Sequence, residues 1–127
     1  MNNTFVFLLM VFLHIVDDYY FQGILAKMKQ KSFWQENAPE PMYRYDYLWA
    51  LIMHAFSWTF MVMLPVMFIN HFILDAEFLL YFIFHLMLHA QTDDLKANAR
   101  KINLWQDQMI HMLQILMIFT RYVIFGG

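Results

Sequence analysis

The sequence contains no cysteine and few charged residues, and both scarcities restrict its chemistry. Without cysteine there is no disulfide, no thiolate nucleophile and no thiolate metal site, so a metal would have to be bound by His, Asp and Glu. Charged residues make up 14% of the 127 residues, whereas soluble domains carry about 25%. The net charge is −2 and no basic stretch is denser than Lys27, Lys29 and Lys31, which argues against a nucleic-acid partner.

Apolar surface is what the sequence has in excess. Hydrophobic residues make up 61% of the chain and include 14 Phe, 12 Met and 7 Tyr. A soluble domain of this length cannot bury that much apolar surface, and a disordered chain does not have this composition. Because lipid would cover such a surface, the composition indicates a single-domain membrane protein.

The runs without charge locate four predicted helices. No Asp, Glu, Lys or Arg occurs in residues 1–16, 47–74, 78–92 and 108–120. A helix that spans a bilayer needs about 20 mostly apolar residues, a length that only the second run reaches without including a charged residue. The sequence therefore predicts an all-α, polytopic four-helix transmembrane bundle, with the alternative of one span and three buried or interfacial helices.

The predicted bundle is one membrane domain, residues 1–127, with helices at about 3–27, 46–70, 73–99 and 104–125. A linker at about 28–45 joins the first two helices, because Pro39 and Pro41 prevent a continuous helix there. The first apolar run has no Lys or Arg before it and acids directly after it. This pattern differs from a secretory signal, so we expect the first helix to be retained.

The distribution of Lys and Arg predicts the orientation of the bundle. Seven of the eight such residues lie in the first and third loops or at their edges, and only Arg121 lies toward the other side. Cytoplasmic loops carry the excess of positive charge in membrane proteins. The first and third loops are therefore predicted to face the cytoplasm, and both termini are predicted to lie on the non-cytoplasmic side.

Ionisable side chains inside the predicted helices follow a regular spacing. Pairs four residues apart occur in three helices: His14 with Asp18, His89 with Asp93, and Asp107 with His111. Four residues make about one helical turn, so both members of a pair lie on one face. Counted from the predicted cytoplasmic ends, these pairs and His54 of the second helix lie at similar depths, mostly about 10–15 Å. A charge within a membrane helix is costly and usually has a function.

Imidazole and carboxylate together are the ligands of zinc, manganese or iron bound without thiolate. Two residues four apart on a helix can bind one ion. We therefore predict a divalent metal site, with zinc or manganese as one ion or as two ions about 3.5–4 Å apart. The predicted metal ligands are His14, Asp18, His89, Asp93, Asp107 and His111. His54 is a further ligand or a proton shuttle, and Gln22 and Lys96 are predicted to orient a substrate oxygen or neutralise a phosphate.

The same residues have a structural alternative, a network of buried hydrogen bonds that joins the helices. His54 read alone is typical of such packing. Asp17 and Asp94 are expected to point about 100° away from the paired acids beside them, and His85 lies one turn deeper. The methionines show no clustered ladder, so a copper relay is not indicated. Ser57 lacks the sequence context of a serine nucleophile.

Taken in order, these segments resemble a family of small bacterial and phage membrane proteins catalogued as domain of unknown function 3307. The segments are HIVDDYYFQ with Lys27 behind it, His54, HAQTDDLK and DQMIH, and together they cover most of the chain. The family usually has a small residue in place of Asp17 and often Phe in place of Tyr19. The resemblance implies a multi-pass protein of the bacterial inner membrane with a polar His/Asp centre, and it implies no established reaction.

The residues leave open whether the protein is an enzyme. One interpretation is a metal-dependent hydrolase that acts on a lipid or another amphipathic phosphoester, with membrane lipid as its partner. The alternative is a non-enzymatic small membrane protein that handles ions or modulates a host membrane complex, and a third is a purely structural bundle. Four helices of this length make a thin bundle, which is compatible with a homo-oligomer or a host membrane-protein partner.

Overall fold

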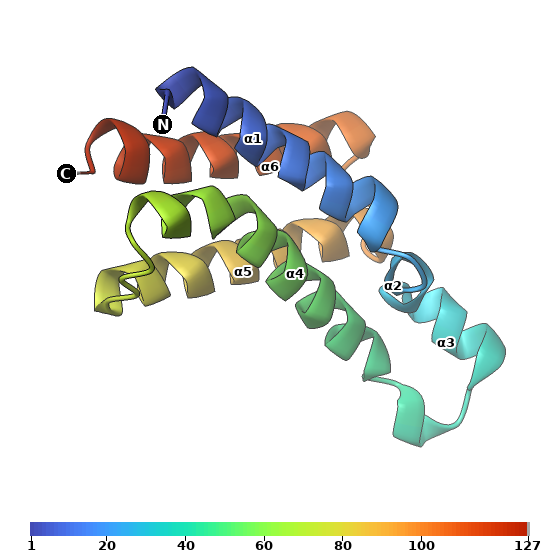
Figure 1. Ribbon diagram of the computed structural model, residues 1–127. Helices are drawn as coiled ribbons and strands as arrows, with labels where there is room; N and C mark the ends of the chain where they lie inside the picture. The colour runs from blue at the N-terminus through green and yellow to red at the C-terminus, as the bar shows by residue number, and fades with distance from the viewer. Residues whose placement is uncertain (127) are drawn as a thin grey trace.

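The computed structural model describes residues 1–126, and every regular element among them is helical, as predicted. Four long helical segments pack together (Figure 1). They are α1 (Asn3–Ile15) with the π-helix η1 (Val16–Phe21), α4 (Asp46–Ile69), α5 (Ala76–Ala97), and α6 (Leu104–Phe119) with the π-helix η3 (Thr120–Ile124). The connection between the first and second segments contains α2 (Leu25–Met28), α3 (Lys31–Asn37) and a 3₁₀ turn, η2 (Pro41–Tyr43).

Side-chain caps determine where three of the long helices begin. Asn2 accepts hydrogen bonds from the backbone N–H groups of the first turn of α1, and Asp75 accepts one from the N–H of Phe78 in α5. At the start of α6, Asn103 and Gln106 cap each other's backbone N–H groups. These bonds satisfy N–H groups that have no partner within the helix, so each helix begins within three residues of its predicted start.

The first predicted helix is shorter than expected. It was predicted to continue to about residue 27, but it ends at Phe21, and α2 begins only at Leu25. The break contains Gly23, whose φ of 53° lies in the left-handed region. Glycine adopts this conformation without the steric cost that a Cβ brings, so the chain can turn here toward the linker.

The two ends of the bundle are formed by different parts of the chain. The two termini and the turn between α4 and α5 lie at one end, whereas α2, α3 and the connection from α5 to α6 lie at the other (Figure 1). Seven of the eight basic residues belong to this second end, and Arg121 belongs to the first. The first and third predicted loops therefore lie at one end of the bundle, and the second loop and both termini lie at the other.

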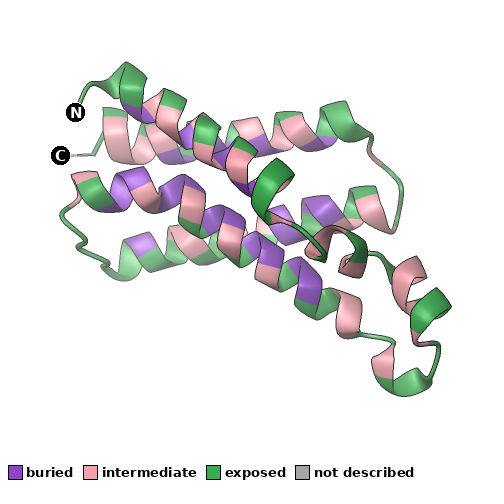
Figure 2. Ribbon diagram, turned by 45° about the vertical axis from the view of Figure 1, so that its right-hand side comes forward, coloured by how far each residue is buried: buried purple, intermediate pink, exposed green. Residues whose placement is uncertain are grey.

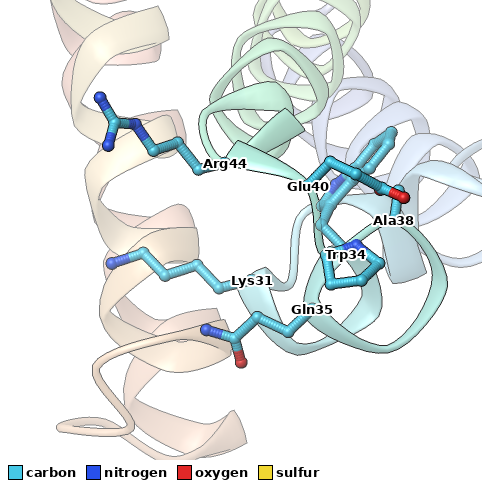
Figure 3. Close-up of a pocket in the computed structure, with 7 residues that line it drawn as sticks. Lys31, Trp34, Gln35, Ala38, Glu40 and Arg44 are labelled. Atoms are coloured by element: carbon cyan, nitrogen blue, oxygen red, sulfur yellow. The ribbon is translucent and has the colours of Figure 1, made fainter. Parts of the chain in front are cut away.

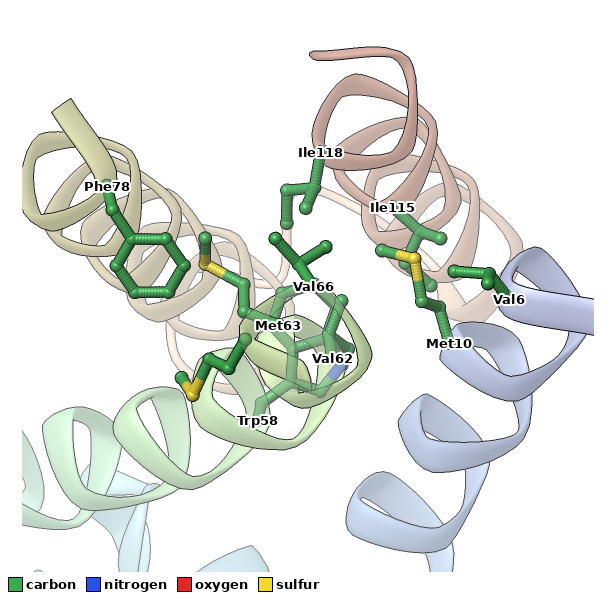
Figure 4. Close-up of a cluster of buried hydrophobic side chains, with 10 residues drawn as sticks. Val6, Met10, Trp58, Val62, Met63, Val66, Phe78, Ile115 and Ile118 are labelled. Carbon is green, nitrogen blue, oxygen red and sulfur yellow. The ribbon is translucent and has the colours of Figure 1, made fainter. Parts of the chain in front are cut away.

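Side chains from all four long segments meet in the apolar core (Figure 4). Its members come from the first halves of the α1–η1 segment and of α5 and from the last parts of α4 and α6, so the core lies toward the end that holds the termini. Trp58 of α4 is fully buried at one edge of this core. Burial of such side chains contributes about 25 cal/mol per Å² of apolar surface removed from water. The other fully buried members come from all four long segments: Val6, Met10, Val62, Met63, Val66, Phe78, Ile115 and Ile118.

Figure 2 shows the exposed and buried residues along each helix. Many of the exposed residues are large and apolar, and many of the buried ones are polar. Phe12 of α1, Leu80 of α5 and Leu113 of α6 are each more than half exposed, while five histidines are almost fully buried. Two helices, Asn3–Phe21 and Pro41–Ile69, are long and apolar enough to cross a membrane by length and composition. Contiguous exposed apolar surface of this kind marks contact with lipid or with another protein.

Candidate metal centre

The tertiary structure brings the three predicted His/Asp pairs and His54 into one buried cluster, here called the His/Asp centre. Every long segment contributes to it: α4 supplies His54, and each of the other three segments supplies one His/Asp pair. Three overlapping groups each place one ligand atom per residue within 4.8 Å of the others. The groups are His14–Asp18–His111, Asp18–His54–His89 and His89–Asp93–His111.

The carboxylate of Asp18 joins three helices. Its Oδ1 lies 3.1 Å from Nε2 of His54 on α4. Its Oδ2 lies 3.5 Å from Nδ1 of His14 on α1 and 3.5 Å from Nδ1 of His111 on α6. One acid therefore faces three imidazoles, which is the arrangement expected of a shared or bridging ligand.

The carboxylate of Asp93 on α5 faces two of these imidazoles, His54 and His111, and also that of His89. Its Oδ2 lies 3.4 Å from Nε2 of His89 and 3.5 Å from Nε2 of His54, and its Oδ1 lies 3.6 Å from Nε2 of His111. Lys29, from the linker, donates a hydrogen bond of 2.9 Å to Oδ2. This ammonium supplies the positive charge that a buried carboxylate requires.

Several atoms of the centre are buried without a hydrogen-bond partner among residues 1–126. They are both ring nitrogens of His89, both ring nitrogens of His111, and Oδ1 of Asp107. Buried polar groups in proteins are nearly always paired, and an unpaired donor or acceptor costs about 1–3 kcal/mol. Such a set of unpaired imidazoles beside carboxylates is typical of a cation site.

The distances within the centre also fit a bound ion. Two ligand atoms at about 2.0–2.1 Å from a tetrahedral zinc ion lie about 3.3 Å from each other. The contacts of His89 and His111 with Asp18 and Asp93 are 3.4–3.6 Å, too long for strong hydrogen bonds. Asp107 lies at the edge, with Oδ1 3.7 Å from Nε2 of His111. The buried His and Asp groups could thus hold a metal ion.

His14 is bound differently from the other histidines. The indole N–H of Trp58 donates to its Nδ1 at 2.7 Å, so its Nε2 carries the proton and donates to Oε1 of Gln108 at 2.9 Å. The Gln108 amide in turn donates to Asp107 at 3.0 Å. Both nitrogens of His14 are therefore occupied, and ligation through Nδ1 would require the bond from Trp58 to break.

Trp58 also packs against the imidazoles of the centre, on the side that faces the apolar core. Its indole stacks on His89 at 4.4 Å between ring centroids, and His89 stacks on His111 at 4.1 Å. The His54 ring lies 5.1 Å from His89. These contacts restrict the rotation of the rings, so the nitrogens of the centre are held in place before any ligand binds.

The predicted direction of Asp17 is wrong. Asp17 is buried rather than turned away: Ser57 donates a hydrogen bond to it, and its Oδ2 lies 3.6 Å from Nδ1 of His54. The reason is that η1 is a π-helix, whose i→i+5 hydrogen bonds turn each residue by less than the 100° of an α-helix. Adjacent acids can then both face the bundle interior. Asp94, which follows Asp93 on α5, lies outside the centre and accepts a hydrogen bond from Asn98.

The remaining predicted residues lie at the edge of the centre or outside it. Lys96 is 42% exposed, and its Nζ lies 3.8 Å from Asp107. The amide of Gln22 donates to the backbone carbonyl of Asp18 at 3.0 Å, so its side chain supports the end of η1 instead of reaching the centre. His85 contacts Gln114, one turn of α5 away from His89.

Sequence reasoning missed three residues that contact the centre: Lys29, Trp58 and Gln108. Gln108 lies within the DQMIH segment, beside Asp107, and that position is a usable signal. Trp58 follows His54 by four residues and so lies on the same face of α4. Lys29 belongs to the linker, where no helical period predicts a direction.

The linker forms a small pocket at the end of the bundle that holds α2 and α3 (Figure 3). It has a volume of about 90 Å³ and is lined by residues of α3 and the segment that follows, including Trp34 and Glu40. Lys31 and Arg44 extend their cationic ends to the same side of this segment (Figure 3). Positive charge and an aromatic ring are therefore concentrated at the end where the predicted cytoplasmic boundary lies.

Comparisons of this chain with protein-family models, with curated proteins and with solved structures found no match. The resemblance to the domain of unknown function 3307 stays a prediction from the sequence. The interpretation of the His/Asp centre therefore depends on its own geometry.

Proposed function

We propose that all four long segments cross a membrane and that the His/Asp centre between them binds a divalent metal ion, zinc or manganese. One observation carries the metal proposal. His89 and His111 present four buried ring nitrogens without hydrogen-bond partners within the described chain, beside carboxylates at 3.4–3.6 Å. The exposed apolar side chains and the two long apolar helices support the membrane part of the proposal.

The proposed orientation follows the positive charge. The end that carries seven of the eight basic residues faces the cytoplasm, and the end with both termini faces the opposite side. The exposed Trp49 and Trp105 are typical of side chains at a membrane boundary. The proposed location is the inner membrane of a bacterium, with the His/Asp centre nearer the cytoplasmic side.

The proposed chemistry is hydrolysis of a lipid or another amphipathic phosphoester. A bound divalent ion would polarise a phosphoryl oxygen and activate water. The two ring nitrogens of His54 lie near the carboxylates of Asp17 and Asp18. His54 can therefore take up a proton while these acids stabilise the imidazolium. Lys96 lies at the exposed edge of the centre, where its ammonium can neutralise a phosphate.

The burial of the centre favours a second candidate, a protein that handles ions without catalysis. The imidazoles of His54, His89 and His111 are no more than 1% exposed, and Lys29 closes over Asp93. This leaves little room for a substrate beside the ion. A small membrane protein that stores or passes a cation, or modulates a host membrane complex, fits the same geometry.

Metal content tests the proposal that both candidates share. Protein purified without a nickel affinity step should contain one or two divalent ions per chain. His89→Ala and Asp18→Asn should lose this metal, and His71→Ala is the matched control because His71 is exposed in the turn after α4. A metal-free protein, or variants that keep the metal, would contradict the proposal.

Catalysis is then tested on the loaded protein. The hydrolase candidate predicts turnover of phospholipid in mixed micelles, with turnover reduced in His54→Ala. If fully loaded protein hydrolyses no phosphoester, the enzymatic candidate is wrong and the ion-handling candidate remains.

A further inference from the structure

A line of polar residues runs along α5 from one end of the bundle to the other. The residues are spaced four apart: Glu77, Tyr81, His85, His89 and Asp93. At 1.5 Å per residue this line is about 24 Å long, most of the roughly 30 Å hydrocarbon thickness of a bilayer. The His/Asp centre accounts for only the last two positions, and the apolar setting gives no reason for the other three.

A residue of α6 or η3 with a polar side chain contacts each of these positions, and the five pairs are here called the polar ladder. α5 runs antiparallel to α6 and η3, and the connection around residues 98–103 joins them. Arg121 and Tyr122 of η3 contact the first two positions, and Gln114 and His111 of α6 contact the last three. The pairs are Glu77 with Arg121, Tyr81 with Tyr122, His85 with Gln114, His89 with His111, and Asp93 with His111.

The middle pair is buried and incompletely bonded. The amide of Gln114 donates to the carbonyl oxygen of His85 at 3.0 Å and to its Nδ1 at 3.2 Å. The proton of the neutral His85 ring is therefore on Nε2. This N–H and Oε1 of Gln114 are buried and have no hydrogen-bond partner in the described part of the chain. A donor and an acceptor at one level can together bind a buried water molecule.

The far end of the polar ladder reaches a pocket at the end of the bundle that holds the termini. This pocket has a volume of about 440 Å³, and its lining includes the polar residues Asn70, Asp75, Glu77, Arg121 and Tyr122. The hydroxyl of Tyr122 is a further buried polar atom without a partner among residues 1–126. Tyr122 belongs to η3, eight residues after Gln114, on the side away from the His/Asp centre.

We propose that the polar ladder is a proton path between this pocket and the His/Asp centre. The proton passes along water molecules hydrogen-bonded to Tyr122, Gln114 and His85. At each step one O–H or N–H bond forms as another breaks, so no co-reactant is needed. On the far side of the centre, Lys96 is 42% exposed and lies 3.8 Å from Asp107, so solvent reaches the edge of the centre there. This inference rests on the proposed crossing of the membrane by α5 and α6, and it requires neither a metal ion nor hydrolysis.

The chemistry of the middle pair favours a proton over a metal cation. Between Glu77 and His89 the ladder offers only neutral groups, and the side chains of His85 and Gln114 are no more than 1% exposed. A cation that loses its water there would gain no carboxylate in exchange. A proton moves between hydrogen-bonded groups without a wide passage.

Proton flux into vesicles tests this path. The full-length protein is reconstituted into vesicles of phosphatidylcholine and phosphatidylglycerol that contain a pH-sensitive dye, and a potassium diffusion potential drives protons inward. Wild-type protein should acidify the interior faster than protein-free vesicles do. His85→Leu and Gln114→Leu should lower the rate to that of protein-free vesicles, because each removes a polar group of the middle pair.

Matched controls separate this path from general damage. Gln91→Leu changes the same kind of side chain at an exposed position of α5, and His71→Leu changes an exposed histidine. Both should keep the wild-type rate. Flotation of the vesicles verifies insertion, and the metal content of His85→Leu should equal that of wild type, so failure of the metal site is recognised separately.

Two results would overturn the proton path. One is a wild-type rate no higher than that of protein-free vesicles, which needs no variant to fold. The other is a wild-type rate that persists in both His85→Leu and Gln114→Leu, which would mean that the middle pair only joins the two helices.

Discussion

Replacing Lys29 by methionine is expected to strengthen metal binding while it weakens the metal-free fold. The ammonium of Lys29 lies 2.9 Å from Oδ2 of Asp93, and its side chain is only 11% exposed. The same carboxylate belongs to one of the three candidate ligand groups. A metal ion that takes this oxygen must first displace the ammonium, so the ion pair opposes metal binding.

The size of the effect follows from the bond that is displaced. A hydrogen bond between charged groups contributes about 1.5–3 kcal/mol, and each 1.4 kcal/mol is about a factor of ten in affinity. Lys29→Met should therefore bind zinc about 10- to 100-fold more tightly. In the metal-free state the substitution leaves Asp93 buried without its cation, and loss of one partner of a buried pair costs about 3–5 kcal/mol.

The assay is a zinc titration of protein stripped by a chelator, in competition with a chromophoric zinc ligand, together with thermal unfolding in detergent. Lys27→Met is the matched control, because Lys27 is exposed and its loss changes the net charge equally. If both substitutions change zinc affinity by the same factor, the effect is only general charge. If Lys29→Met leaves affinity unchanged or lowers it, Asp93 is not a ligand and the reasoning is wrong.

Three further predictions concern the hydrogen bond from Trp58 to His14, the break in the chain after η1, and the orientation of the protein in the membrane. Trp58→Phe removes the donor to Nδ1 of His14 and should lower the free energy of unfolding by about 1–3 kcal/mol, measured by thermal unfolding, whereas the exposed Trp49→Phe should change little. Gly23→Ala should cost about 1–2 kcal/mol because of the positive φ, with metal content unchanged; an unaltered unfolding temperature would contradict the strain. A reporter fused after Gly127 should appear outside the cytoplasmic membrane, and a cytoplasmic reporter would refute the proposed orientation.

Local pattern was enough to predict the helices and the faces on which the pairs lie. α4 was predicted at about 46–70 and is found at Asp46–Ile69, because a long apolar run with no charge has few alternatives to a helix. The spacing of four puts His89 and Asp93 on one face, and they lie 3.4 Å apart. The same local reasoning failed for Asp17, because no residue pattern announced the π-helix.

By itself, the sequence determined that the protein is all-helical, that its surface is apolar, and that acids and histidines share helix faces, because composition and the helical period are properties of neighbouring residues. Only the tertiary structure decided which faces meet. The rotation of each helix about its axis depends on packing, and packing brought Asp18 to three imidazoles from three helices. It also brought Lys29 from the linker to Asp93, 64 residues away. No local period relates residues so far apart, so these contacts exist only in the folded chain.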